Sequence, residues 1–330
     1  MQLPMSLILP TYDDVRAATR RLAGVVRRTP VIEFPELAAM CGAAEVYLKC
    51  ENLQLGAAFK YRGASNAILA LSQQATAAGG QLSAVVTHSS GNHGASVAMA
   101  ARRISLTAHV VVPSTVSPAK LKLIREAGAV VEICEPNVAA REAAVERIRA
   151  STGAAVVHPY DDNLVIAGQG TAAVELIEQA PSIDTIVAPV SGGGLIGGCG
   201  LAAHGVSSNF AVYAAEPELA NDAALSLAAG KLLPGVATAN KTIADGLRAQ
   251  LSPRTFALLQ QHVTAVITTT EAQLTSAMRF TWEHTKMVIE PSCAVAVAAL
   301  TVRPELFAGK SVGIIITGGN VDLSGKLPWQ

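Results

Sequence analysis

Short hydrophobic runs, many of them rich in β-branched residues, alternate with alanine-rich stretches along most of the chain. Apolar runs of about four to eight residues between turn signals are typical of strands that are buried on both faces. The sequence therefore predicts strands at Glu45–Leu48, Ala84–Thr87, Ala108–Val112, Val130–Ile133, Ala155–His158, Thr185–Pro189, Ala211–Ala215, Ala265–Thr268 and Val312–Ile316. It predicts helices that include Tyr12–Val25, Tyr61–Ser72, Gly94–Ala101, Ala119–Glu126, Val138–Ala150, Thr171–Gln179 and Glu271–His284.

This alternation predicts an α/β protein whose parallel, twisted sheets are flanked by helices. The stretch from Ala84 to His158 forms a compact βαβαβαβ series of its own. We therefore expect a small domain over residues 76–159, inserted into a large domain built from residues 1–75 and 160–330. Ligands of parallel sheets bind beyond the carboxyl ends of the strands, so the loops that follow strands are the best candidates for functional sites.

The composition excludes several classes of partner. The 330 residues include 25 basic and 25 acidic side chains, and a net charge of zero argues against a nucleic acid or an anionic membrane surface. The five cysteines are widely spaced without a CxxC pair, so we expect reduced thiols rather than disulfides or a zinc site. No run approaches the ~20 apolar residues of a membrane helix, and Met1–Pro10 lacks the features of a signal peptide, so a cytoplasmic location is expected.

The loop after the predicted strand Ala84–Thr87 consists of small and polar residues and reads His-Ser-Ser-Gly-Asn-His-Gly. Where such a loop enters a helix, several backbone N–H groups and the positive end of the helix dipole converge, which suits a carboxylate. A simpler alternative is a helix N-cap formed by Ser90 or Asn92. The length of the polar run favours the anion-binding loop.

A second loop, Ser191–Gly198, follows the predicted strand Thr185–Pro189 and is rich in glycine. Its backbone amides can approach a phosphate closely at the start of a helix. The same loop satisfies the GxGxxG pattern, and the acidic residue Glu216 follows it at the end of the next strand. That combination is the fingerprint of dinucleotide binding, so on this loop alone a nicotinamide-dependent dehydrogenase is the first hypothesis.

Two further segments carry candidate chemistry. Lys60 follows small and apolar residues at the start of a helix, where desolvation lowers a lysine pKa and favours a Schiff base. A lone lysine is more often a solvated surface residue than a catalytic one. Only the presence of the two anion loops makes a catalytic role the better interpretation of Lys60. Thr317-Gly318-Gly319-Asn320 follows the last predicted strand, and it is equally compatible with a ligand-binding loop and with a plain glycine turn.

In this order, the four segments resemble the fold-type II pyridoxal-phosphate enzymes, specifically the serine/threonine dehydratase and serine racemase family. The resemblance extends from about Thr11 to the C-terminus. It is carried by Arg28–Pro30, Phe59–Ala64, Ser89–Gly94, Ile166–Thr171, the glycine loop, Thr242–Gly246, Glu290–Pro291 and Thr317–Asp322. It implies a two-lobed fold like that of tryptophan synthase β, a mobile small domain that carries the substrate-carboxylate loop, and a homodimer.

The resemblance assigns roles toward the cofactor pyridoxal 5′-phosphate. Lys60 would form the Schiff base beside Phe59, and Thr317 would meet the pyridine nitrogen through its hydroxyl. A neutral hydroxyl does not hold that nitrogen protonated, which favours rapid β-elimination. The phosphate would lie on Gly192, Gly193 and Gly194, although Ser191 stands where most relatives have another glycine.

Toward a small amino-acid substrate, the resemblance implies that the carboxylate is bound by Ser89, Ser90, Asn92 and His93. Asn92 would also donate a hydrogen bond to the phenolic oxygen of the cofactor. Lys60 would remove the α-proton, and loss of water and then ammonia from L-threonine or L-serine would give a 2-oxo acid.

Two residues keep other activities open. Ser90 stands where racemases have an acid/base group on the opposite face of the α-carbon, so serine racemase with side dehydratase activity is one alternative. Arg141 matches an arginine that would bind a second carboxylate, so a 3-hydroxyaspartate ammonia-lyase is another. Gly56-Ala57-Ala58 replaces the Thr-Gly-Ser of relatives beside the lysine, and this departure is the only support for a binding protein without activity.

The resemblance also implies a divalent-cation site. The carboxylates of Glu216 and Asp222 and the carbonyl oxygen of Ala220 would bind Mg²⁺, Ca²⁺ or Mn²⁺, with water completing the shell of hard oxygen ligands. The alternative is a pair of solvated acids in a turn that caps the following helix.

Overall fold

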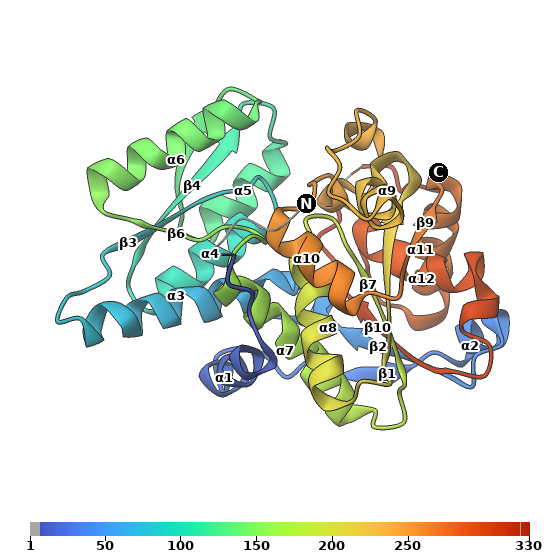
Figure 1. Cartoon of the computed structure of the whole chain (residues 1–330). Coiled ribbons are helices and arrows are strands. Elements are labelled where there is room, and N and C mark those ends of the chain that lie inside the picture. Colours follow the sequence, from blue (N-terminus) through green and yellow to red (C-terminus); the bar gives the residue numbers. More distant parts are fainter. Residues whose placement is uncertain (1–6, 324) are drawn as a thin grey trace.

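The structure is a computed structural model that describes residues 7–323 and 325–330, and the strands of this part of the chain form two sheets (Figure 1). The larger sheet has the order β1 (Val31–Glu33), β2 (Glu45–Cys50), β10 (Ser311–Ile316), β7 (Thr185–Pro189), β8 (Ala211–Pro217) and β9 (Ala265–Thr269). The smaller sheet has the order β5 (Val130–Cys134), β4 (Thr107–Pro113), β3 (Ala84–His88) and β6 (Ala155–Val156). Neighbouring strands are parallel except β1 and β2.

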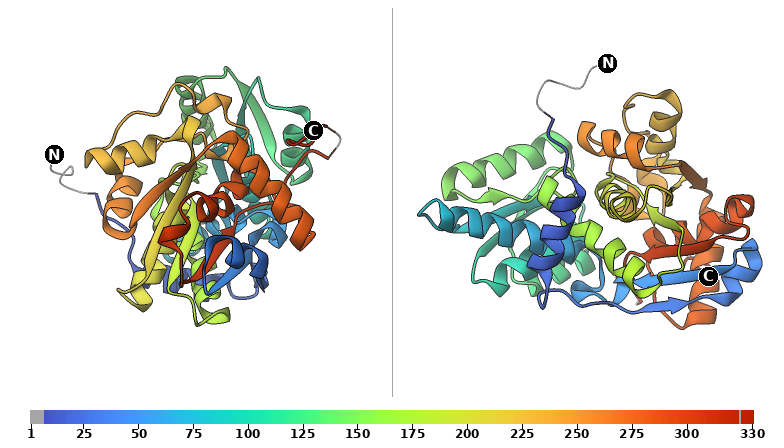
Figure 2. Two further views of the ribbon diagram at one scale, coloured as in Figure 1. Left: turned by 90° about the vertical axis from the view of Figure 1, so that its right-hand side faces the viewer. Right: turned by 60° about the horizontal axis from the view of Figure 1, so that its bottom comes forward.

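Helices cover both faces of each sheet, and the right-hand view of Figure 2 shows the two lobes side by side. One face of the larger sheet packs against α1 (Tyr12–Leu22), α7 (Asn163–Gln179), α8 (Gly194–Val206) and α10 (Pro253–His262). The other face packs against α2 (Pro35–Cys41), α11 (Glu271–Thr285) and α12 (Pro291–Val302), and α9 (Asp222–Ala229) lies beside α10. The smaller sheet has α3 (Lys60–Ala77), α4 (Asn92–Arg103) and α5 (Pro118–Glu126) on one face and α6 (Val138–Thr152) on the other.

The continuous apolar strands are buried on both faces, as their sequence predicted. In β10, Ile314 and Ile316 join the hydrophobic core under α2, α11 and α12, whereas Ile315 joins the core under α7 and α8. All three side chains are fully buried. Because successive side chains of a strand point to opposite faces, only a run of apolar residues can serve two cores at once. The predicted α/β class is confirmed.

Several elements differ from the prediction. β1, α2, α10 and α12 were not among the predicted elements, no bounds were predicted for α8 and α9, and the strand predicted to reach His158 ends at Val156. Helix α7 begins at Asn163 rather than Thr171, because its glycines, poor helix formers by propensity, are required by packing. A Cβ atom on Gly168 would lie 2.7 Å from the Cα atom of Gly63, so the close crossing of α3 and α7 requires glycine there.

The predicted domain boundaries stay a prediction. Helix α3 extends past residue 75, and its Ala64 and Ile68 belong to the core of the smaller lobe together with Val85 and Val110. Within the residues that the structure describes, no helix is both long and apolar enough to cross a membrane. Four of the cysteines are buried, Cys134 is partly exposed, and all five are free thiols.

Candidate active site

Three predicted motifs follow neighbouring strands of the larger sheet. The lysine segment follows β2, Thr317 follows β10, and the glycine loop follows β7. Because β10 lies between β2 and β7 and is parallel to both, the three carboxyl ends meet at one edge of the sheet. The Phe59 N–H donates to the Thr317 carbonyl oxygen over 3.0 Å, and the Gly319 N–H donates to the Ala57 carbonyl oxygen over 3.0 Å. These bonds hold the lysine segment against the Thr317 loop.

Lys60 is the first residue of α3, and its amine is desolvated. The Nζ atom donates to the carbonyl oxygen of Pro159 over 3.0 Å, in the segment that leads from the smaller sheet to α7. Burial lowers the pKa of Lys60 to about 8, and the charge of Glu290 opposes part of this shift. A neutral amine is therefore present close to pH 8, as Schiff-base formation and proton removal require.

The glycine loop has the geometry of an anion site. Gly193 is the N-cap residue of α8 and has a φ of 85°, a left-handed conformation that favours glycine. A Cβ atom on Gly192 would lie 2.5 Å from the ring of Tyr160, so no side chain fits at this position. The first turn of α8 leaves backbone N–H groups without helical partners, and these groups and the helix dipole favour a phosphate. The Pro159–Tyr160 segment thus contacts both the lysine amine and the glycine loop.

Asn92 joins the smaller lobe to the larger one. Gly91 is the N-cap residue of α4 and no side chain caps this helix, so the N-cap alternative for Ser90 or Asn92 is wrong. Instead, the Nδ2 atom of Asn92 donates to the two carboxylate oxygens of Glu290 over 3.0 and 3.2 Å. Its Oδ1 atom accepts a hydrogen bond from Asn320 Nδ2 over 2.9 Å. These contacts with Glu290 and Asn320 were not predicted.

The other residues of the predicted carboxylate loop differ in accessibility. Ser89 and Ser90 are partly exposed, and the Gly91 N–H donates to Ser89 Oγ over 3.3 Å. His93 is buried, and its Nε2 atom lies 3.1 Å from the carbonyl oxygen of Val157. Burial, followed by the charge of Lys60, lowers the pKa of His93 well below its ordinary value, so the ring is neutral. The hydroxyl groups are more accessible to a carboxylate than this imidazole.

Aromatic rings and one arginine surround the end of β3. The His158 ring centroid lies 5.3 Å from that of His88 and 4.8 Å from that of Tyr160. His158 Nδ1 accepts from the Asp161 N–H over 2.8 Å, and burial lowers its pKa to about 4, so it is neutral at physiological pH. Burial, followed by the positive charge of Arg141, lowers the pKa of His88. Burial raises the pKa of Tyr160, and the charge of Arg141 opposes that rise. The Nε atom of Arg141 donates to the carbonyl oxygen of Asn137, the N-cap residue of its own helix, over 3.4 Å.

A buried ion-pair network beside Lys60 was not predicted. Arg62 donates to the two carboxylate oxygens of Glu51 over 2.7 and 2.8 Å and to the two of Glu175 over 2.8 Å each. Lys49 Nζ donates to Glu175 over 2.7 Å. The side chains of Lys49, Glu51 and Arg62 are fully buried, so the network anchors the start of α3 to β2 and α7. The charged residues Lys49 and Glu51 at the end of the apolar strand β2 are the feature of the sequence that could have indicated this network.

Two acidic residues stand at the predicted cation site. Glu216 and Asp222 are buried, and neither forms an ion pair within the described part of the chain. Glu216 Oε1 accepts from the Ala224 N–H over 2.7 Å, which is the helix-capping contact of the alternative interpretation. Burial raises the pKa of Glu216 to about 8, and the nearby Asp222 carboxylate adds to this rise. Carboxylate oxygens are ligands that suit a hard divalent cation.

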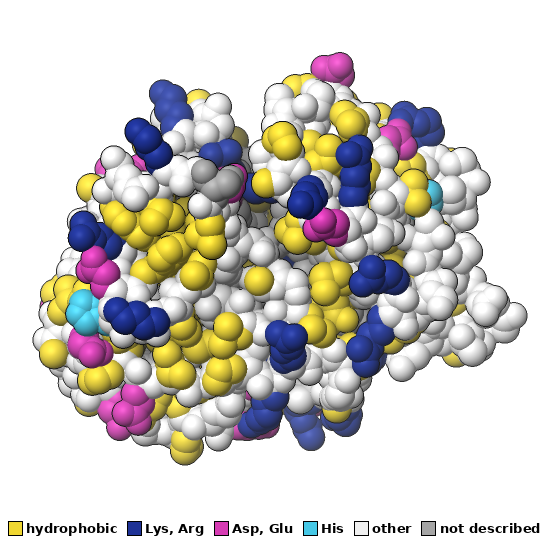
Figure 3. Space-filling view, turned by 180° about the vertical axis from the view of Figure 1, so that it is seen from behind, with side chains coloured by type: hydrophobic (Ala, Val, Ile, Leu, Met, Phe, Trp, Pro, Cys, Tyr) yellow, Lys and Arg dark blue, Asp and Glu magenta, His cyan; other side chains and the backbone are white. Residues whose placement is uncertain are grey.

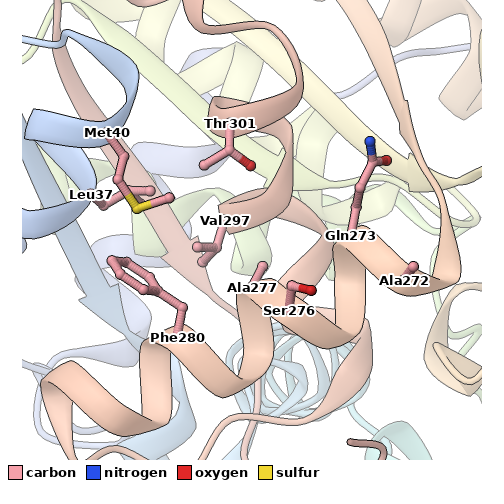
Figure 4. A pocket seen from close by; sticks show the side chains of 9 residues that line it. All are labelled: Leu37, Met40, Ala272, Gln273, Ser276, Ala277, Phe280, Val297 and Thr301. Carbon is pink, nitrogen blue, oxygen red and sulfur yellow. The ribbon is translucent and has the colours of Figure 1, made fainter.

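The molecular surface is notched between the two lobes, as seen from behind in Figure 3. A separate groove lies between α2, α11 and α12 and is lined mainly by small and apolar side chains, among them Leu37, Met40, Phe280 and Val297 (Figure 4). None of the predicted site residues lines this groove. The candidate active site is therefore the place where the three loops of the larger lobe meet the Asn92 loop of the smaller one.

The site residues fit one cofactor chemistry. Lys60 offers a desolvated amine, the loop at Gly192 offers an anion site, and the buried Thr317 directly follows β10, the strand between β2 and β7. Pyridoxal 5′-phosphate requires these three partners, for its aldehyde, its phosphate and its ring nitrogen. The fold and site thus define an enzyme that uses this cofactor on amino acids.

The chain belongs to the family described as pyridoxal-phosphate dependent enzyme, whose sequence profile matches residues 22–318. It is 43% identical to a β-hydroxyaspartate dehydratase of Paracoccus denitrificans, over 98% of this chain and 100% of that protein. The structure of maize serine racemase has a TM-score of 0.89 and 39% identity, over 96% of this chain and 95% of that one. The structure of a threonine deaminase from T.th. has a TM-score of 0.85 and 36% identity, over 96% of this chain and 100% of that one. These matches confirm the predicted family and replace the dehydrogenase hypothesis.

Proposed function

We propose that this chain is an ammonia-lyase that eliminates water from 3-hydroxyaspartate and yields a 2-oxo acid and ammonia. The observation that carries the choice of substrate is Arg141 on α6, whose positive charge lowers the pKa of His88 and opposes the rise in the pKa of Tyr160. The similarity to a β-hydroxyaspartate dehydratase supports the same choice. L-Serine and L-threonine, which the sequence placed first, become secondary substrates because they lack a second carboxylate.

The side chains of the site divide the work of β-elimination. Bound pyridoxal phosphate supplies an electron-withdrawing ring that acidifies the proton on the α-carbon of the substrate. Lys60, whose pKa is about 8, accepts that proton at Nζ as a neutral amine. Ser89, Ser90 and the backbone N–H groups at the start of α4 bind the α-carboxylate, and the helix dipole favours its negative charge. The unsaturated amine that remains after loss of water is hydrolysed to the 2-oxo acid and ammonia.

Arg141 gives the site its selectivity for a dicarboxylate. It lies on α6 of the smaller lobe, and it is the one cation among the groups that shift the pKa of Tyr160. A guanidinium can form two parallel hydrogen bonds with a carboxylate, which fixes its orientation as well as its charge. The β-carboxylate of 3-hydroxyaspartate would be bound in this way.

Racemisation is the second candidate function. Ser90 lies on the partly exposed loop from which a hydroxyl could return a proton to the α-carbon, and serine racemases are among the proteins similar to this chain. A serine hydroxyl titrates far from neutral pH without a neighbouring base, so elimination is expected to be the faster reaction.

We further propose a divalent cation, Mg²⁺, Ca²⁺ or Mn²⁺, bound by the carboxylates of Glu216 and Asp222 and the carbonyl oxygen of Ala220. The buried position of both carboxylates supports this site. The predicted homodimer and the cytoplasmic location stay predictions, and the mass of the purified protein in light scattering checks the first.

A substrate panel tests the proposed function. The purified protein with pyridoxal phosphate is mixed with L-serine, L-threonine and both diastereomers of 3-hydroxyaspartate, and the 2-oxo acid, the ammonia and the chirality of the remaining substrate are measured. We expect Arg141→Ala to raise KM for 3-hydroxyaspartate by about 10- to 100-fold, as for a lost hydrogen bond to a charged group, and to leave KM for serine unchanged.

The matched control for this panel is Arg147→Ala. Arg147 lies on the same helix as Arg141, is exposed and pairs with Glu132 on the surface. Equal effects of Arg141→Ala on serine and on 3-hydroxyaspartate would contradict the proposed selectivity. Inversion of serine without ammonia would establish the racemase, and bound cofactor without any turnover would establish a binding protein.

A further inference from the structure

Glu290 has no role in the proposed reaction, yet it lies at the centre of the site. It is the N-cap residue of α12, and its backbone N–H donates to the carbonyl oxygen of Gly318 over 2.9 Å. Its side chain caps no helix and turns instead toward the boundary between the lobes, where both carboxylate oxygens accept from Asn92 Nδ2. The charge of Glu290 also raises the pKa of Lys60.

The Thr317 loop is shaped around this carboxylate. A Cβ atom on Gly318 would lie 2.6 Å from Glu290 Oε1, which is too close for any residue other than glycine without a shift of the glutamate. Gly318 also pairs with Ala58 in the bridge that joins the loop to the lysine segment. The glycine turn is therefore the space that lets Glu290 reach Asn92.

The two contacts of Asn92 fix the orientation of its amide. A carboxylate only accepts hydrogen bonds, so Glu290 must face the NH₂ group of Asn92 and not its oxygen. The oxygen accepts from Asn320, whose Nδ2 atom also donates to the carbonyl oxygen of Gly56 over 2.9 Å. The NH₂ group has two hydrogens. The two carboxylate oxygens of Glu290 can share one of them, which leaves the second to be donated to a ligand.

We propose that Glu290 is a positioning residue that orients the Asn92 amide toward the cofactor and ties the substrate loop of the smaller lobe to the larger lobe. Asn92 is the first residue of α4, so fixing its side chain fixes the backbone N–H groups that are proposed to bind the α-carboxylate. The inference rests on the proposed function only for the effect of Glu290 on turnover. The two measurements described below do not involve turnover.

The charges around Glu290 set how strong this tie is. Burial raises the pKa of Glu290 to about 7; the Asn92 amide lowers it, Asp245 raises it, and the Asn320 N–H and Lys120 lower it. Lys120 and Asp245 form an ion pair between the lobes, and the charge of Glu290 also acts on the buried Cys293 thiol and on the Lys60 amine. A hydrogen bond to the ionised carboxylate is stronger than one to the neutral acid, so the tie weakens as Glu290 is protonated.

The experiment compares Glu290→Gln and Glu290→Ala with the wild type, all as holoenzymes. Hydrogen exchange over residues 89–96 measures how firmly the substrate loop is held, and the pH midpoint of the visible cofactor band measures the imine formed with Lys60. We expect Glu290→Ala to raise the exchange rate by about 10- to 100-fold, the worth of a hydrogen bond to a charged group. Glu290→Gln, which keeps one acceptor oxygen, should raise it less. In both variants the pH midpoint falls, because the negative charge that raises the Lys60 pKa is gone.

Glu283→Gln is the matched control, because Glu283 is exposed and pairs with Arg279 on the surface of α11. It should change neither the exchange rate nor the pH midpoint. A merely structural role would lower the unfolding temperature of the Glu290 variants without moving the midpoint of the cofactor band, and that result would overturn the proposal. If Glu290→Ala does not fold, Glu290→Gln decides by the same two measurements. Neither measurement needs a substrate. If the substrate panel shows no turnover but the Glu290 variants still exchange faster over residues 89–96, only the proposed function is rejected.

Discussion

Replacing Arg62 by methionine tests whether the buried ion-pair network fixes the segment that carries Lys60. The guanidinium makes two hydrogen bonds with the carboxylate of Glu51 and two with that of Glu175. Methionine is a flexible, unbranched side chain that fills the space without a charge. In the variant the two carboxylates stay buried, and Lys49 is the one cation of the network that remains.

The expected loss follows from the charge balance of the network. Two cations face two carboxylates in the wild type, and the variant leaves one cation against two carboxylates. Removing one partner of a buried pair costs about 3–5 kcal/mol, because the charge that remains is no longer compensated. We expect the free energy of unfolding of Arg62→Met to fall by about this amount. Turnover should fall as well, because the start of α3 loses its anchor.

The same network predicts how the loss depends on pH. Desolvation alone would raise the pKa of Glu175, but the hydrogen bonds and charge of Arg62 lower it below its ordinary value of 4.5. A carboxyl group with a lowered pKa in the folded state stabilises the protein fully above the ordinary value, and this contribution is lost as the pH falls through the lowered one. The difference between the wild type and Arg62→Met should therefore shrink as the pH falls below the ordinary value of 4.5.

Urea denaturation followed by circular dichroism measures the difference at neutral pH and in acid. Arg279→Ala is the control, because its pair with Glu283 on α11 is exposed to solvent, and such pairs contribute little to stability. If Arg62→Met unfolds at the same urea concentration as the control, the network does not stabilise the start of α3 and the reasoning is wrong.

Two further predictions concern Lys60 and the cation site. In protein freed of cofactor, the modification rate of Lys60 by an amine reagent should rise with a midpoint near pH 8, because only the neutral amine reacts, and peptide mapping measures it. A midpoint at the ordinary lysine value of 10.5 would show that the amine is solvated. Added Mg²⁺ or Ca²⁺ should raise the unfolding temperature of the wild type but not of Glu216→Gln, since ligands of the folded state stabilise it. If the cation raises the unfolding temperature of the wild type and of Glu216→Gln equally in calorimetry, Glu216 is not a ligand of the cation.

The sequence predicted the strands well because a strand buried on both faces leaves a continuous apolar run. It predicted helices less well wherever a helix is buried on nearly all sides. In α12, all residues from Ser292 to Leu300 are buried, and in α8 all from Gly194 to Ala203 are buried. Neither helix has a polar face, so the 3.6-residue periodicity by which helices are recognised is absent. The small strand β1 has three residues, too few for any pattern to be distinguished.

The candidate site likewise contains residues that the sequence predicted and contacts that it did not. Thr317 and the glycine loop were predicted because each follows a strand whose end could be identified in the sequence, whereas Lys60 was predicted from the small and apolar residues before it and from the resemblance to a family. The contact between Asn92 and Glu290 joins residues that are 198 positions apart, and neither residue shows in its local sequence that it needs the other. The charged residues Lys49 and Glu51 were visible at the end of an apolar strand, but their partners on α3 and α7 follow only from the packing of those helices.

The order of the strands in the larger sheet brings together motifs that are far apart in the sequence. In the chain, β10 comes after all the other strands of its sheet, but in the sheet it lies between β2 and β7. This insertion places Thr317 between the lysine segment and the glycine loop, whereas consecutive strands placed side by side would have left it at an edge. The insertion also brings Gly318 against Glu290 and thereby gives Asn92 its acceptor. One topological choice therefore assembles the cofactor site and the contact between the lobes, which is why a change in the Thr317 loop should alter cofactor binding and loop mobility together.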